Sequence, residues 1–293
     1  MGEIHFGLEL EYLYYKGRNI YKVCRDLNRI MKEGGCPISF SLKDYGDSNY
    51  TIWKIVKDCS IYANDDDYEL YGELIGFEII SPILTMKDIP LLERFLSILE
   101  NEMPLLVNDT CGFHIHISQD NQVLNRDSLV KFLKTYLVFE DAIDTLHHDS
   151  RIFNVYCDSI RYNKKFREKT MEEIFAEIDK CRTKWGVIWS AHPVFRHRDY
   201  KINLQNQWIL GWGIEFNFTR KPTIEFRQHI GSFGKNVVLA WLILVVNFFG
   251  SYQDVFDEKI LLKIEKLGIR RKLEHFFDIY VNDKSVKKHY LLV

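Results

Sequence analysis

The chain has 293 residues, enough for one large domain or two of ordinary size. Hydrophobic residues make up 46% and charged residues 27%, a composition typical of a globular protein with a sizeable core. The formal net charge is −2, so no overall positive field favours binding to nucleic acid or to an anionic membrane.

Seven segments show the alternation of apolar and polar residues, or the β-branched and aromatic enrichment, that predicts strands. They are residues 5–12, 51–58, 76–81, 112–118, 201–206, 213–219 and 223–229. The last two are separated by only three residues, which predicts a tight hairpin. In one register of that hairpin, Glu215 would lie opposite Arg227 and form an ion pair with it.

Helices are predicted where a capping residue precedes an apolar stripe at helical spacing. One begins after Asp88, a longer one begins after Asn125 or Asp127, and a third begins after Thr170, whose capping box is completed by Glu173. These helices fall between strands, but not in a regular strand–helix alternation.

The rest of the chain gives few signals of organisation. A further helix is expected after position 234 and another is expected to end near position 268, whereas residues 64–67 are interpreted as an exposed acidic loop. There is no repeat, no low-complexity linker and no sharp change of composition. We therefore predict a single domain over residues 1–293, with 251–293 as a C-terminal helical tail.

The cellular setting is inferred from the cysteines and the apolar segments. The six cysteines form no CxxC pair, and their spacing suggests neither a zinc ribbon nor a disulfide framework. We expect reduced thiols and a cytoplasmic protein without a leader. The apolar run 237–246 is shorter than the roughly 20 residues of a membrane span, which favours a buried helix.

Three of the strand segments carry two polar residues separated by one apolar residue. These pairs are Glu9 and Glu11, His114 and His116, and Glu225 and Arg227. Residues two apart in a strand point to the same face of the sheet. The intervening Leu10, Ile115 and Phe226 would then point into a core. Clustered carboxylates repel each other and resist desolvation, so a divalent cation and a phosphate would stabilise such a face.

Three further polar residues strengthen this prediction. Glu78 is the only charge in an apolar strand, Asp58 ends another strand, and Asn203 lies in the segment YKINL. A donor set rich in carboxylates, with one or two histidines, suits magnesium or manganese better than a structural zinc. An arginine beside such donors suits a phosphoryl group in transfer. Each pair alone has an ordinary interpretation, such as a solvated strand face or an ion pair within one strand.

The polar segments occur in a specific order along the chain: FGLELEY, WKIVKDCS, GFEIISPIL, CGFHIHIS, YKINL and IEFRQHIGS. In this order they resemble the putative amidoligase family, which is similar to glutamine synthetase and glutamate–cysteine ligase. The resemblance runs from about Phe6 to about Phe249. It implies an α+β, glutamine-synthetase-like catalytic domain, in which a curved antiparallel sheet forms a funnel with helices packed on its outer face.

The resemblance also implies two metal sites on the inner face of the funnel. Glu9, His114 and Glu225 match the residues that share one metal. Glu11 and Glu78 match ligands of the other metal, near the reacting carboxylate.

Four other residues receive roles from the same resemblance. Arg227 matches the arginine that steadies the phosphoryl group and binds the nucleotide, and His116 would support a metal ligand or contact the nucleotide. Asp58 and Asn203 match positions that face the amine or carboxylate substrate. Cys59 stands where the family more often has a small residue, which leaves the detail of the substrate pocket open.

We therefore expect an ATP-dependent carboxylate–amine ligase that forms an amide or isopeptide bond through an acyl phosphate. Its cofactors would be ATP with Mg²⁺ or Mn²⁺, and its partners small-molecule or peptide carboxylates and amines, rather than nucleic acid or a membrane. No glycine-rich phosphate loop is present in the sequence, so metals and Arg227 would hold the phosphates of ATP. The alternatives are a metal-dependent hydrolase that uses the HxH strand and a non-catalytic descendant that binds a nucleotide or peptide. The sequence fixes neither the substrates nor the oligomeric state.

Overall fold

A computed structural model of the chain describes residues 2–44, 47–152, 154–193, 199–208 and 221–291. The chain divides into two compact units, each built from separate segments. Unit 1 consists mainly of residues 3–116 and 229–239, and unit 2 of residues 117–228 and 240–293. The single domain expected over the whole chain stays a prediction.

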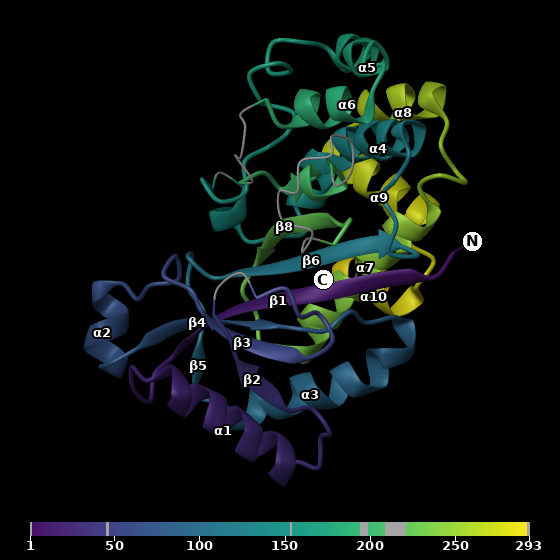
Figure 1. Ribbon diagram of the computed structural model, residues 1–293. Helices are drawn as coiled ribbons and strands as arrows, with labels where there is room; N and C mark the ends of the chain where they lie inside the picture. The colour runs from purple at the N-terminus through teal and green to yellow at the C-terminus, as the bar shows by residue number, and fades with distance from the viewer. Residues whose placement is uncertain (1, 45–46, 153, 194–198, 209–220, 292–293) are drawn as a thin grey trace. The chain divides into compact units, whose positions relative to one another are not determined.

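The sheet of unit 1 carries the first polar pairs. Its strands are β1 (Ile4–Tyr14), β2 (Phe40–Leu42), β3 (Trp53–Lys57), β4 (Ile75–Ile80), β5 (Leu105–Leu106) and the first part of β6 (Gly112–Gln119). They follow the order β2-β3-β4-β1-β6, and β5 pairs with β1 (Figure 1). The pairs β1–β4, β3–β4 and β1–β5 are antiparallel, whereas β2 and β3 are parallel.

Helices cover the apolar face of this sheet. Unit 1 contains α1 (Ile20–Glu33), α2 (Asp65–Tyr71), the 3₁₀ turn Met86–Asp88 and α3 (Ile89–Glu102). Helices α1 and α3 contact each other and lie along one side of the strands (Figure 1). Phe95 of α3 packs against Trp53 and Phe40, with ring centroids 5.0 and 6.0 Å away. Burial of this apolar face leaves the opposite face of β1 and β4 for polar residues.

Unit 2 is mostly helical around a short strand pair. Strand β7 (Ile202–Asn203) pairs antiparallel with β8 (Ile224–Ile230), so that Ile202 lies opposite Phe226 and Asn203 lies opposite Glu225. The 3₁₀ turns are Asp149–Arg151 and Gln205–Trp208, and the helices are α4 (Arg126–Asp144), α5 (Met171–Asp179), α6 (Lys184–Ala191), α7 (Lys235–Ser251), α8 (Glu258–Glu265), α9 (Ile269–Tyr280) and α10 (Lys284–Leu291). The first turn of α7, up to Leu239, belongs to unit 1.

Helix α4 is central to the packing of unit 2, since it contacts α5, α6, α8 and α9. Phe132 of α4 meets Phe226 of β8 at a centroid distance of 6.1 Å and Tyr252 at 5.3 Å. Large buried rings such as these supply much of the hydrophobic stabilisation of a core. The expectation that Phe226 points into a core is thus confirmed, and Leu10 and Ile115 are likewise fully buried.

The eight strands of the described residues belong to one open, largely antiparallel sheet. The expected combination of an antiparallel sheet with helices is therefore confirmed. The parallel pairing of β2 with β3 was not predicted. The funnel shape and the likeness to glutamine synthetase stay predictions.

Most predicted elements are present, but three differ from expectation. The acidic stretch 64–67 opens α2 instead of forming a loop, because Asn64 and Asp67 accept hydrogen bonds from each other's backbone N–H groups. Asp88 precedes α3 as predicted, but its carboxylate accepts from the Thr85 N–H. Strand β7 covers only two residues of the predicted 201–206. The predicted strand 213–219, its hairpin and Glu215 lie outside the described residues.

The apolar helix predicted near 237–246 is α7, which is largely buried. Across the part of the chain that the structure describes, no helix combines the length and the apolar character needed to cross a membrane.

Candidate active site

A carboxylate pair on β1 faces away from the core of unit 1. Alternation along the strand buries Leu8 and Leu10 on one face and places Glu9 and Glu11 on the other. The antiparallel register sets Glu11 directly opposite Glu78 of β4. Glu11 and Glu78 are only 7% and 5% exposed. Like charges opposite each other across two strands are destabilising, and burial adds to the cost of keeping both ionised.

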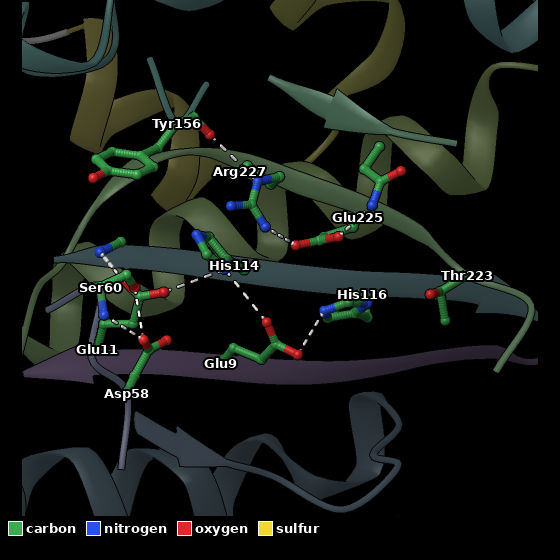
Figure 2. Close-up of polar contacts among 12 residues, drawn as sticks. Glu9, Glu11, Asp58, Ser60, His114, His116, Tyr156, Thr223, Glu225 and Arg227 are labelled. Atoms are coloured by element: carbon green, nitrogen blue, oxygen red, sulfur yellow. Dashed lines mark hydrogen bonds and ion pairs between the residues drawn. The ribbon is translucent and has the colours of Figure 1, made fainter. Parts of the chain in front are cut away.

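Strand β6 adds two histidines to the same group (Figure 2). The Nε2 atom of His116 lies 2.9 Å from Glu9 Oε1, and the Nδ1 atom of His114 lies 3.3 Å from Glu9 Oε2. His114 Nδ1 is also 3.7 Å from Glu11 Oε1. Unit 1 thus brings together five of the predicted site residues: Glu9, Glu11, Glu78, His114 and His116.

Gly112 fixes the geometry where β6 begins. Its N–H donates a buried hydrogen bond of 2.6 Å to Glu11 Oε2. A Cβ atom on Gly112 would lie 2.5 Å from His114 Nε2 and 3.3 Å from Glu11 Oε2. No side chain fits there unless both site residues move. Sequence reasoning did not single out Gly112, although a glycine directly before the HxH strand was the available signal.

The electrostatics of the group are those of crowded carboxylates. Burial raises the pKa of Glu78 well above its ordinary value, and the negative charges of Glu9, Glu11 and Asp58 raise it further. Burial also acts to raise the pKa of Glu9, but His116 and His114 outweigh it and hold that pKa well below its ordinary value. A cation would offset the repulsion that acts on Glu78, so the residues present fit a divalent metal ion.

Asp58 lies one residue after β3, at the border of this group. Its Oδ1 atom accepts hydrogen bonds of 2.7 Å from both the N–H and the hydroxyl of Ser60. Its charge contributes to the raised pKa of Glu78. Cys59, between Asp58 and Ser60, is exposed.

Lys54 is a charged residue of the same unit that sequence reasoning missed. It is two residues before Val56, which lies opposite Glu78, so alternation places Lys54 on the carboxylate face. The side chain is 1% exposed, and its ammonium group donates to the Asp47 carbonyl at 2.7 Å. The ammonium also lies 4.5 Å from the centroid of the Tyr50 ring. The signal that could have placed Lys54 on this face is its alternation with Val56 and Asp58 along the strand.

Unit 2 brings together the other three predicted site residues, Asn203, Glu225 and Arg227, of which Figure 2 labels Glu225 and Arg227. Arg227 Nη1 pairs with the Glu225 carboxylate, and Asn203 Nδ2 donates to Glu225 Oε2 at 2.8 Å. Arg227 Nε donates to the Tyr156 carbonyl at 3.4 Å, and Arg227 Nη2 is 3.9 Å from Asp199 Oδ1. Asn203 and Glu225 are buried. The guanidinium group is therefore oriented by partners on several sides, of which Tyr156 and Asp199 were not foreseen.

The metal-ligand set expected for Glu9, His114 and Glu225 draws on residues of both units, and it stays a prediction. So does the division of the five carboxylate and histidine ligands between two metals.

Comparisons with known proteins bear on the whole chain. A family model described as putative amidoligase enzyme matches residues 2–249. No curated protein matches the chain. Among solved structures, the crystal structure of a bifunctional glutathione synthetase from Pasteurella multocida is similar, with 12% identity and a TM-score of 0.43. That match covers 98% of this chain and 46% of the other, so the chain spans about half the length of that protein. Since the family model covers most of its length, the chain belongs to the putative amidoligase family.

Proposed function

We propose that the protein is an ATP-dependent ligase that joins a carboxylate to an amine. The observation that carries the proposal is the carboxylate–histidine group of unit 1, in which Glu9 contacts two histidines and Glu11 lies opposite the buried Glu78. Membership of the putative amidoligase family supports the reaction class.

In this proposal the metal ligands are Glu9, Glu11, Glu78, His114 and Glu225. A bound Mg²⁺ or Mn²⁺ would supply charge neutralisation for the phosphates of ATP. His116 would hold Glu9 in its orientation or contact the nucleotide, since its Nε2 atom lies 2.9 Å from Glu9 Oε1. Preorganised donors of this kind lower the barrier because they need no rearrangement during the reaction.

Arg227 would contact the phosphoryl group in transfer. Its guanidinium group is oriented by Glu225 and by the Tyr156 carbonyl, which suits a residue that must present N–H donors in fixed directions. The carboxylate of the substrate attacks the γ-phosphorus, the bond to ADP breaks, and an acyl phosphate forms. An amine then attacks the acyl carbon, loses a proton, and inorganic phosphate leaves. Asp58 and Asn203 would orient the carboxylate or the amine.

The direct test is ADP release in the presence of Mg²⁺ with a panel of amino acids, peptides and amines. With a substrate that is turned over, Glu225→Gln should lower the rate by about 100-fold, because it removes a charge from the donor set while keeping its size. Glu102→Gln, an exposed carboxylate at the end of α3, is the matched control and should keep the wild-type rate.

Three results would refute the assignment. Equal rates for the wild type and Glu225→Gln on a good substrate would remove Glu225 from the chemistry. Amide hydrolysis without nucleotide, together with retained zinc, would instead favour a metal-dependent hydrolase. Nucleotide binding without turnover of any substrate in the panel would favour a non-catalytic descendant.

A further inference from the structure

A half-buried carboxylate at the end of α4, Asp144, connects strands β7 and β8. Asp144 Oδ2 accepts a hydrogen bond of 2.5 Å from Lys201 Nζ, and Asp144 Oδ1 accepts one of 3.2 Å from Gln228 Nε2. Lys201 directly precedes β7, and Gln228 belongs to β8. A single side chain therefore holds both strands of the pair that carries Asn203, Glu225 and Arg227.

The same network reaches the backbone of Arg227 on both sides. The Arg227 N–H donates to the Lys201 carbonyl at 2.8 Å. The Arg227 carbonyl accepts from Arg151 Nη2 at 2.7 Å. Gln228, the next residue, is the one that bonds to Asp144. The backbone N–H of Arg227 is thus held by Lys201, and its backbone carbonyl is held by Arg151.

Burial makes this network sensitive to the loss of one member. Lys201, Gln228 and Arg151 are each 1–2% exposed, and Glu140 places a second carboxylate 3.5 Å from Lys201 Nζ. Without the Asp144 carboxylate, Lys201 keeps, among the described residues, only the more distant Glu140 as a counter-charge, and a buried charge that loses part of its compensation favours rearrangement of its surroundings. Asp144 connects residues at the two strands, so we expect the rearrangement there.

Two other buried lysines of unit 2 have partners of a different kind. Lys134 of α4 pairs with Asp179 and Glu258, and Lys272 pairs with Asp141 and Glu265. These pairs connect helices or their ends, and no strand residue takes part in them. Asp144 differs because its two hydrogen bonds go to the strand pair.

We infer that Asp144 is a positioning residue for Arg227. It fixes the β7–β8 pair, with Arg151 completing the hold on the Arg227 backbone, so that the guanidinium group points in one direction before a ligand arrives. What Arg227 binds rests on the proposed function. How Arg227 is held rests on the contacts above and is independent of that function.

The first test measures the backbone directly, by amide hydrogen exchange with NMR detection. In Asp144→Asn, the Arg227 amide should exchange about tenfold faster than in the wild type, whereas buried amides of α9 should keep their rates. Tyr136→Phe is the matched control on the same helix. Its hydroxyl is buried and has no hydrogen-bond partner within the described residues, so its removal should leave the Arg227 amide unchanged. An equal acceleration of Arg227 and of α9 would mean that Asp144 only stabilises the fold, and would overturn the inference.

The second test uses a non-hydrolysable ATP analogue with Mg²⁺. Asp144→Asn should weaken its binding by about tenfold in the wild-type background and by less than about twofold when Arg227 is already methionine. The same loss in both backgrounds would contradict an effect through Arg227. If the wild type does not bind the analogue, the proposed function fails while the exchange measurement still decides the role of Asp144. If Asp144→Asn does not fold, Gln228→Met, which removes only the 3.2 Å hydrogen bond, should show the same pattern at smaller size.

Discussion

At the scale of single residues, Glu9 and Glu78 show how one environment shifts the pKa values of two similar side chains in opposite directions. Both belong to the carboxylate face of unit 1, but two histidines hold the pKa of Glu9 down, while burial and neighbouring carboxylates raise that of Glu78. A face on which one carboxylate favours the ionised form and another favours the protonated form has donor oxygens in place, and binding of a cation would favour release of the proton.

Gly112 gives the first residue-scale prediction. Gly112→Ala should weaken Mn²⁺ binding by at least about tenfold, because the new Cβ would lie 2.5 Å from His114 Nε2 and would displace that ring. Titration calorimetry measures the change. Gly7→Ala in β1 is the matched control, since its Cβ would lie no closer than 3.8 Å to any atom of other residues. A Gly112→Ala protein that binds Mn²⁺ like the wild type would show that the close approach does not matter for the metal.

The raised pKa of Glu78 predicts how the stability of the protein depends on pH. Its pKa in the folded protein lies above the ordinary value of 4.5, so the unfolded chain gives up this proton at lower pH than the folded protein does. The stability that Glu78 contributes is therefore complete below about pH 4.5 and is lost as the pH rises through the folded-state pKa. Glu9 acts in the opposite sense, since its lowered pKa contributes stability that is lost as the pH falls.

Urea unfolding with a chelator present, repeated across this pH range, measures the Glu78 effect. Glu78→Gln cannot ionise, so its stability should fall less than that of the wild type as the pH rises. Parallel curves for the two proteins would show that Glu78 does not retain its proton.

At the scale of elements, the sequence predicts best where one local signal dominates. Alternation identifies β1, β6 and β8, and side-chain caps identify α4 and α5, where Asn125 and Thr170 accept the expected hydrogen bonds. Strand β7 is shorter than predicted because Asn203 Oδ1 accepts from the Gln205 N–H, which turns the chain out of the strand. Helix α2 was missed because a run of acidic residues resembles a solvated loop, although Asn64 can cap it.

A local signal of the same kind also predicts part of the candidate site. Paired polar residues at period two mark Glu9, Glu11, His114 and His116 without knowledge of the fold. The contacts that orient them depend on long-range register. Gly112 meets Glu11 across 101 positions of the sequence, and Asp144 reaches Gln228 across 84. No local pattern indicates such pairs, so Gly112 and Asp144 emerge only from the structure.

At the scale of the whole molecule, the question is whether the two units unfold together. Strands β6 and β8 each have residues in both units, so loss of either unit would interrupt strands of the other. We therefore expect one cooperative transition, consistent with a single domain. Four of the five predicted metal ligands, Glu9, Glu11, Glu78 and His114, lie in unit 1 and only Glu225 lies in unit 2, so we expect a cation to stabilise mainly unit 1.

Scanning calorimetry with and without Mn²⁺ tests this coupling. At a free Mn²⁺ concentration 100 times the Kd, binding adds about 2.7 kcal/mol to the free energy of unfolding, which should raise the Tm by roughly 5 °C. The whole transition should move, because a ligand of unit 1 then stabilises unit 2 as well. The shift should vanish in His114→Ala, and NaCl at matched ionic strength should not reproduce it. Two separate transitions, of which Mn²⁺ moves only one, would show that the units unfold independently and that the chain is not a single domain.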